Sequence, residues 1–188
     1  IGRLSVFMLD ASRTSFSLFP SSDWETRHSC VSAYYVAGQI AGEGRSVYDE
    51  SLYSLPSAPD ERRKPRLLGA FKVDVYEYPP PFLLLPRALR AVAPEFTSFR
   101  SLWFGLAGGL VLAGLLAVAG FLGPAAGTRM LLLSPLAWVA LPTLSALQKG
   151  NVQLLTVAAS MFARSLVSMP SVSICRRMSM KNERGMAV

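Results

Sequence analysis

Apolar residues are concentrated in the second half of the chain, where three long stretches carry almost no charge. Residues 101 to 128 contain no charged side chain, and two shorter apolar stretches follow at 130 to 148 and 150 to 167. A helix rises about 1.5 Å per residue, so roughly 20 apolar residues cross the hydrocarbon core of a membrane. The pattern predicts three transmembrane helices, at about 101 to 122, 130 to 148 and 150 to 167, with Arg164 reaching to the membrane surface.

The remaining residues are more polar and flank this apolar region. Residues 1 to 20 are partly apolar but interrupted by charged side chains, which predicts the remnant of a transmembrane helix rather than a complete one. Residues 21 to 100 hold most of the polar side chains and are predicted to form a long loop on one side of the membrane. Residues 168 to 188 form a basic tail, which is either a genuine cytoplasmic tail or an artificial end.

Two segments of the long loop have the pattern of helices. Residues 31 to 41 follow Ser29, a residue type that caps helix N-termini, and they carry tyrosines and an isoleucine suited to one apolar face. Residues 82 to 92 are apolar except for Arg87 and Arg90, a pattern typical of a helix that lies in the membrane interface. We therefore expect interfacial helices in this loop.

Prolines mark the connections between these segments. Residues 54 to 66 contain three prolines and a run of charged residues, which predicts a surface loop. Residues 72 to 78 alternate in part like a strand. Three consecutive prolines at 79 to 81 are expected to end any regular element at that point.

The charge balance differs between the two halves. The chain has 188 residues, 51% of them hydrophobic and 16% charged, and a net charge of +7. Residues 1 to 100 carry 12 basic and 11 acidic side chains, whereas residues 101 to 188 carry 7 basic side chains and one acid, Glu183. Carboxylate chemistry must therefore come from the first half. Basic residues flanking membrane helices explain the excess positive charge, and without a basic stripe interleaved with aromatics we expect no nucleic-acid partner.

Residue types that bind metals are few. The two cysteines, Cys30 and Cys175, form no Cys-x-x-Cys motif, and the single histidine, His28, cannot build a His-rich site. The sequence also lacks an Asp-x-Asp cluster that could hold a divalent cation. We expect no metal and no cofactor, and we interpret both cysteines as packing residues.

The densest group of reactive side chains is the stretch from Asp23 to His28, Asp-Trp-Glu-Thr-Arg-His. A carboxylate beside a membrane can act as a general base toward a hydroxyl group, and an arginine can bind a phosphate oxygen. The alternative is a capped loop whose charges only pair with one another. The residues alone leave both interpretations open.

Several short motifs follow one another along residues 20 to 160: Asp23, Tyr34-Tyr35-Val-Ala-Gly38-Gln, Gly44-Arg-Ser-Val-Tyr48-Asp49, Tyr76-Glu-Tyr78-Pro-Pro-Pro-Phe82, Trp103, and Lys149-Gly150-Asn151-Val-Gln153. In their order, and in their spacing relative to the predicted transmembrane helices, they resemble the start of glycosyltransferase family 87. The resemblance implies the GT-C class of membrane enzymes, many of which are mannosyltransferases that use polyprenyl-phosphate sugars.

The resemblance also implies roles for individual residues. The family places its catalytic aspartate in an external loop, at a position that corresponds to Asp23, with Glu25 as a less suitable substitute. As a general base, Asp23 would accept the proton of the acceptor hydroxyl, while the phosphate leaves without strong acid assistance. The substrate contacts predicted with it are Arg27, His28, Tyr78, Lys149, Asn151 and Gln153.

These contacts differ in what supports them. Two predicted helices separate the turn at 148 to 151 from the loop, which returns Lys149, Asn151 and Gln153 to the side of Asp23, where they either meet donor phosphate and sugar hydroxyls or form a plain polar turn. Arg27 and His28 are predicted to contact phosphate or acceptor. Tyr78 either binds sugar or, with its three prolines, shapes the loop.

We therefore expect an all-α integral membrane protein of GT-C type, with an external loop bearing interfacial helices followed by about three transmembrane helices. It would transfer a hexose, foremost mannose, from a polyprenyl phosphate to a lipid or glycan acceptor with inversion. Its partners would be membrane lipids, this donor and the acceptor. We place it in the cell membrane as a multi-pass protein, with residues 21 to 100 on the external or periplasmic side because the basic flanks favour that orientation.

Two departures from the family lead us to expect a fragment that is inactive on its own. The chain lacks a clean first transmembrane helix, and it has about three such helices where GT-C enzymes have many more. The alternative is a non-catalytic membrane subunit or a piece of a transporter. Transporters typically place ionisable residues within their transmembrane helices, and the predicted helices here are nearly free of them.

Overall fold

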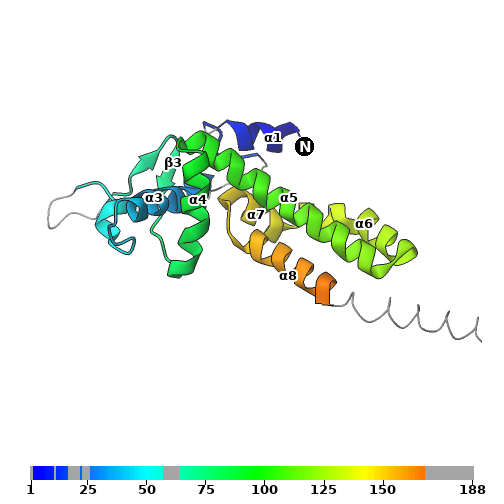
Figure 1. Ribbon diagram of the computed structural model, residues 1–188. Helices are drawn as coiled ribbons and strands as arrows, with labels where there is room; N and C mark the ends of the chain where they lie inside the picture. The colour runs from blue at the N-terminus through cyan, green and yellow to red at the C-terminus, as the bar shows by residue number, and fades with distance from the viewer. Residues whose placement is uncertain (1, 11, 17–21, 23–25, 57–63, 168–188) are drawn as a thin grey trace, which may run out of the picture. The chain divides into compact units, whose positions relative to one another are not determined.

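The computed structural model describes residues 2 to 167, apart from 11, 17 to 21, 23 to 25 and 57 to 63 (Figure 1). The chain is mostly helical. It forms two compact units. The first unit comprises Ile1–Gly108 and Val139–Val152, and the second comprises Gly109–Trp138 and Gln153–Val188.

The centre of the first unit is helix α3 (Cys30–Gly42), which confirms the helix predicted at 31 to 41. Nine of its 13 residues are buried, including Tyr34 and Ile40. The apolar residues are therefore not confined to one face, because the protein itself covers the helix on most sides. That the helix lies in a membrane interface stays a prediction. Ser29 is the N-cap residue, as predicted, but its side chain makes no capping hydrogen bond.

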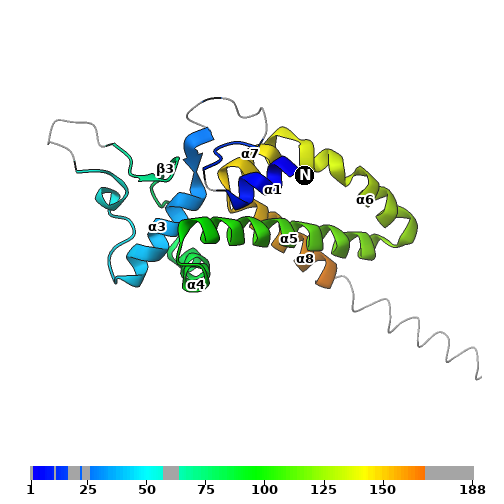
Figure 2. The same cartoon turned by 90° about the horizontal axis from the view of Figure 1, so that it is seen from above.

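Helix α4 (Leu84–Val92) packs against α3 in both views (Figures 1 and 2). It is preceded by the short 3-10 helix η2 (Pro80–Leu83), so the consecutive prolines begin a regular element instead of ending all structure. Their fixed backbone angle suits the first turn of a helix, where no amide hydrogen is needed. Pro86 is buried, Arg87 is exposed, and the Arg90 guanidinium lies 4.9 Å from the centre of the Tyr35 ring.

A small three-stranded sheet departs from the all-helical expectation. The strands are β1 (His28–Ser29), β2 (Leu67–Leu68) and β3 (Phe71–Val73), in the order β1-β3-β2. Strand β3 runs parallel to β1 and antiparallel to β2. The strand predicted at 72 to 78 is thus present only at its start.

The region predicted as a surface loop at 54 to 66 is more ordered at its ends than expected. The 3-10 helix η1 (Glu50–Tyr53) precedes it, and an antiparallel bridge joins Ser54 to Pro65. Arg66 donates its backbone amide to the Tyr53 carbonyl at 3.0 Å. The two described ends of the segment therefore lie side by side, and residues 57 to 63 lie outside the described part.

The long helix α5 (Phe96–Leu122) contributes its first residues to the core of the first unit. Trp103 is fully buried, with its ring centre 4.6 Å from that of Tyr34. Its indole Nε1 donates a hydrogen bond of 2.9 Å to the carbonyl of Gly150, the residue that follows helix α7 (Leu141–Lys149). This bond ties two segments 47 residues apart in the sequence.

Arg100 is a buried cation at the start of α5. Its guanidinium donates to the carbonyls of Asp10 at 3.2 Å and Arg13 at 3.4 Å, and it lies 4.2 Å from the centre of the Phe7 ring. Helix α1 (Gly2–Leu9), which carries Phe7, is eight residues long. Residues 2 to 10 were expected to be the remnant of a transmembrane helix. They form a short helix whose Phe7 is buried against Phe104 in the first unit.

One helix of the described residues is long and apolar enough to cross a membrane, namely α5. The helix predicted at 130 to 148 is divided instead into α6 (Pro124–Val139) and α7, which meet the length requirement only when taken together. Pro142 lacks the amide hydrogen that would continue the helix across Ala140. Helix α8 (Gln153–Val167) has 15 residues within the described part of the chain, fewer than a transmembrane helix needs.

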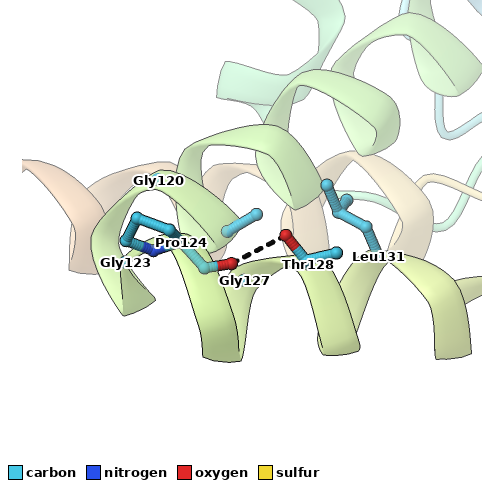
Figure 3. Close-up of a pocket in the computed structure, with 7 residues that line it drawn as sticks. Gly120, Gly123, Pro124, Gly127, Thr128 and Leu131 are labelled. Atoms are coloured by element: carbon cyan, nitrogen blue, oxygen red, sulfur yellow. Dashed lines mark hydrogen bonds between the residues drawn. The ribbon is translucent and has the colours of Figure 1, made fainter.

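The second unit is held together by small residues. Gly114 of α5 faces Ala158 and Met161 of α8. At the turn between α5 and α6, a side chain on Gly127 would lie 2.2 Å from the Ala119 carbonyl oxygen, so only glycine permits this approach. Figure 3 shows the shallow groove beside the turn, where Thr128 donates a 2.7 Å hydrogen bond to the Pro124 carbonyl.

Candidate functional site

Parallel pairing of β1 with β3 brings three reactive side chains together in the first unit. His28 is paired with Lys72 and Ser29 with Val73, so Cys30 and Asp74 are the next residues along the two strands. Residues two apart in an extended chain point to the same side. As a result, one ligand atom each from His28, Cys30 and Asp74 lie within 4.8 Å of one another, and His28 Nε2 is 3.1 Å from Asp74 Oδ2.

Ser32 fixes the position of Asp74. Its hydroxyl is fully buried and donates to the Lys72 carbonyl at 3.0 Å, with the Ser29 carbonyl at 2.6 Å as a second acceptor. The same hydroxyl accepts a hydrogen bond of 3.4 Å from the Asp74 backbone amide. The end of β3 is therefore anchored to the first turn of α3, which carries Cys30.

Two tyrosines surround the Cys30 thiol. Tyr34 is one helical turn after Cys30 and is fully buried, and its ring meets that of Tyr78 edge to face at 5.3 Å. Both hydroxyls hydrogen-bond to the cysteine. Tyr34 in turn accepts a hydrogen bond of 3.3 Å from the backbone amide of Val152. A hydrogen-bonded path therefore runs from the turn after α7 to the Cys30 sulfur.

Burial controls the protonation of this group. Desolvation raises the pKa of the Cys30 thiol above its usual value, and the nearby Asp74 carboxylate raises it further, while hydrogen bonds from Tyr78 and Tyr34 oppose the shift. Burial also raises the pKa of Asp74, against the attraction of His28. The site therefore favours the neutral forms of Cys30 and Asp74 more than water does.

Lys149 adds a positive charge to the same region. It is the last residue of α7, which packs against β1, and its charge acts to lower the pKa of Cys30. Gly150 ends the helix in the left-handed conformation with φ of 67°. A side chain there would lie 2.1 Å from the Val31 side chain, so glycine allows α7 to end directly against α3.

The predicted contact residues are only partly brought together. His28 lies beside Cys30 and Tyr78 hydrogen-bonds to it, whereas Lys149 acts on Cys30 only through its charge. Asn151 lies in the turn after Gly150, with its backbone amide bonded to the Ala146 carbonyl at 2.9 Å. Arg27 is exposed beside His28, and Gln153 is exposed at the first position of α8, in the second unit. The predicted base, Asp23, lies outside the described residues.

Three residues around the Cys30 thiol, namely Cys30 itself, Asp74 and Tyr34, were not predicted as site residues from the sequence. Cys30 was interpreted as a packing residue, although its spacing of two from His28 was visible in the sequence. Asp74 lies 44 positions beyond Cys30, and no local pattern predicts that their two strands pair in parallel. The sequence predicts Tyr34 on the apolar face of a helix, whereas its hydroxyl hydrogen-bonds to Cys30 and accepts a hydrogen bond from the Val152 amide.

Comparisons of the chain with models of protein families, with curated proteins and with solved structures found no match. The resemblance to glycosyltransferase family 87 therefore stays a prediction.

Proposed function

We propose that this chain is part of a membrane glycosyltransferase. The reaction would transfer a hexose, with mannose as the first candidate, from a polyprenyl phosphate to a lipid or glycan acceptor. The acceptor oxygen attacks the anomeric carbon, the bond to the phosphate breaks with inversion, and Asp23 takes the acceptor proton. In this proposal the protein crosses the cell membrane several times, with residues 21 to 100 on the external or periplasmic side.

One observation supports the proposal: two predicted contact residues from distant parts of the sequence, His28 and Tyr78, lie at the Cys30 thiol, and the charge of a third, Lys149, acts on that thiol. His28 comes from β1, Tyr78 from the segment before η2, and Lys149 from the end of α7. Polar side chains that converge from separate segments are what a binding site requires.

The chemistry of the group suits a sugar phosphate. The Lys149 ammonium can bind a phosphate oxygen, and such charge-assisted hydrogen bonds are roughly twice as strong as neutral ones. Tyr78 and the imidazole of His28 can donate to or accept from sugar hydroxyls. In this proposal Arg27 and Asn151 give further polar contacts. Helix α5 is long and apolar enough to hold the chain in a membrane, and a polyprenyl donor dissolves in the same membrane.

Binding of the donor tests the proposal without requiring turnover. The chain is placed in lipid nanodiscs with a polyprenyl-phosphate mannose that carries a photoactivatable group, and covalent labelling is measured. We expect labelling that unlabelled polyprenyl-phosphate mannose prevents and the corresponding polyprenol does not. Lys149→Gln should weaken labelling about 10-fold to 100-fold, because a hydrogen bond to a charged group contributes about 1.5 to 3 kcal/mol.

Lys64→Gln is the matched control, since Lys64 is an exposed lysine of the same unit. It should leave labelling unchanged. Equal competition by the polyprenol would show that only the lipid chain is bound, which contradicts the proposal and favours a non-catalytic membrane subunit. Equal effects of the two lysine substitutions would remove Lys149 from the site.

A further inference from the structure

The side chains of His28, Cys30 and Asp74 offer a nitrogen, a sulfur and an oxygen within 4.8 Å of one another. This mixture of ligand types is typical of zinc, because imidazole and thiolate both suit this borderline-soft ion and carboxylate completes many such sites. We propose that these three residues bind a zinc ion, and the proposal does not depend on the glycosyltransferase function.

The observed spacing is close to that of a zinc site. With zinc–ligand distances of about 2.0 to 2.3 Å in a tetrahedron, neighbouring ligand atoms are about 3.3 to 3.6 Å apart. His28 Nε2 and Asp74 Oδ2 are 3.1 Å apart. A longest separation of 4.8 Å leaves a contraction of about 1 Å, which side-chain rotation can supply.

The surroundings of the three residues favour a bound cation. Cys30 is the first residue of α3, where the positive end of the helix stabilises a thiolate once its proton is released to solvent. The Tyr34 and Tyr78 hydroxyls hydrogen-bond to its sulfur, and Ser32 holds the backbone of Asp74. Such outer contacts orient metal ligands.

Charge and access are also suitable. The carboxylates of Asp74 and the nearby Glu77 outnumber the positive charge of Lys149, and the Cys30 thiol would become a thiolate as the zinc ion displaces its proton to solvent. The side chains of His28 and Asp74 are 21% and 37% exposed, so an ion can enter from solvent while the sulfur is buried. Three protein ligands leave a fourth zinc position for water or another oxygen ligand.

Metal titration of the whole chain in detergent tests the proposal. Cobalt replaces zinc as a spectroscopic probe, and a thiolate ligand gives a charge-transfer band in the near ultraviolet. We expect one cobalt ion per chain, a thiolate band, and displacement by zinc. Cys30→Ser should abolish the band, while His28→Gln and Asp74→Asn should each weaken zinc binding at least about 10-fold, since even outer contacts change affinity by that amount.

Cys175→Ser is the matched control, because it removes the other cysteine and should leave the band unchanged. Circular dichroism establishes that each variant keeps its helices. Asp74→Asn remains informative where Cys30→Ser does not fold, because the Asp74 side chain is partly exposed. A folded chain that binds no zinc overturns the proposal, as does a thiolate band that depends on Cys175 or equal zinc affinity in the Asp74→Asn variant.

Discussion

Large aromatic side chains form a fully buried core in the first unit, whereas the described residues of the second unit bury no apolar side chain larger than valine. Tyr34, Phe71, Phe99 and Trp103 are all at most 1% exposed. In the second unit several leucines and a phenylalanine are at least half exposed, namely Leu112, Leu116, Phe121, Leu132, Leu133 and Leu136. All six tyrosines of the chain belong to the first unit.

The difference teaches that the two units need different surroundings. The first unit satisfies its aromatic residues by its own packing and carries a polar cluster, as a water-facing unit does. Helices that bury so few of their large apolar side chains need a lipid or protein partner to cover them. A chain with both properties fits a membrane protein whose chemistry lies in the first unit.

The largest expected effect concerns the predicted base. If the chemistry belongs to the first unit, Asp23→Asn should lower sugar transfer at least about 100-fold, because a general base contributes about 100-fold to 10,000-fold in rate. Sugar transfer is measured at saturating donor and acceptor, in membranes that contain an active glycosyltransferase with this sequence as part of its chain. Glu25→Gln should have little effect. Transfer at a near-normal rate by Asp23→Asn would remove the base from the proposal.

Gly150 tests the close packing of the first unit. Gly150→Ala combines a left-handed backbone, costing about 1 to 2 kcal/mol, with a side chain forced against Val31, costing about 1 to 3 kcal/mol more. Gly44 also has a positive φ, but a Cβ atom added there would have no neighbour within 4 Å. Gly44→Ala should therefore cost only the backbone part. Equal loss of unfolding free energy in detergent for both variants would refute the packing of α7 against α3.

Gly127 gives the corresponding test in the second unit. Gly127→Ala should destabilise this unit by about 1 to 3 kcal/mol, because the obstructing atom belongs to the backbone at Ala119 and cannot rotate away. A Cβ atom added at Gly120 would have no neighbour within 4 Å. Gly120→Ala should therefore stabilise the helix by up to about 1 kcal/mol, because alanine has the higher helix propensity. Loss of helicity on titration with denaturing detergent measures both. A tolerated Gly127→Ala would contradict the tight turn.

The smallest effect is a pH dependence confined to the first unit. Burial raises the pKa of Tyr76 to about 12 from its usual 10.0. Below about pH 10 the tyrosine is neutral in both states, so its contribution to stability is complete; between about pH 10 and 12 the unfolded state ionises first, and stability falls. Tyr76→Phe should reduce this alkaline loss. A loss of equal size in the second unit, which has no tyrosine, would contradict the comparison.

The sequence predicted the helices better than the site. Long apolar or periodic segments identified α3, α4, α5 and α8, since these patterns are local. The division between α6 and α7 had a visible signal in Pro142, which the apolar length of the segment concealed. The cluster of His28, Cys30 and Asp74 depends on strand pairing across more than 40 residues, and such pairing leaves no local pattern.

Photolabelling from within the membrane tests the central claim most directly. A small apolar carbene precursor that dissolves in lipid is activated with the chain in bilayers, and mass spectrometry locates the adducts. We predict adducts at the exposed leucines of the second unit, such as Leu116 and Leu133, and none at the exposed Leu55 and Leu67 of the first unit. Adducts at Leu55 and Leu67, with none at Leu116 and Leu133, would contradict the assignment of the second unit to the membrane.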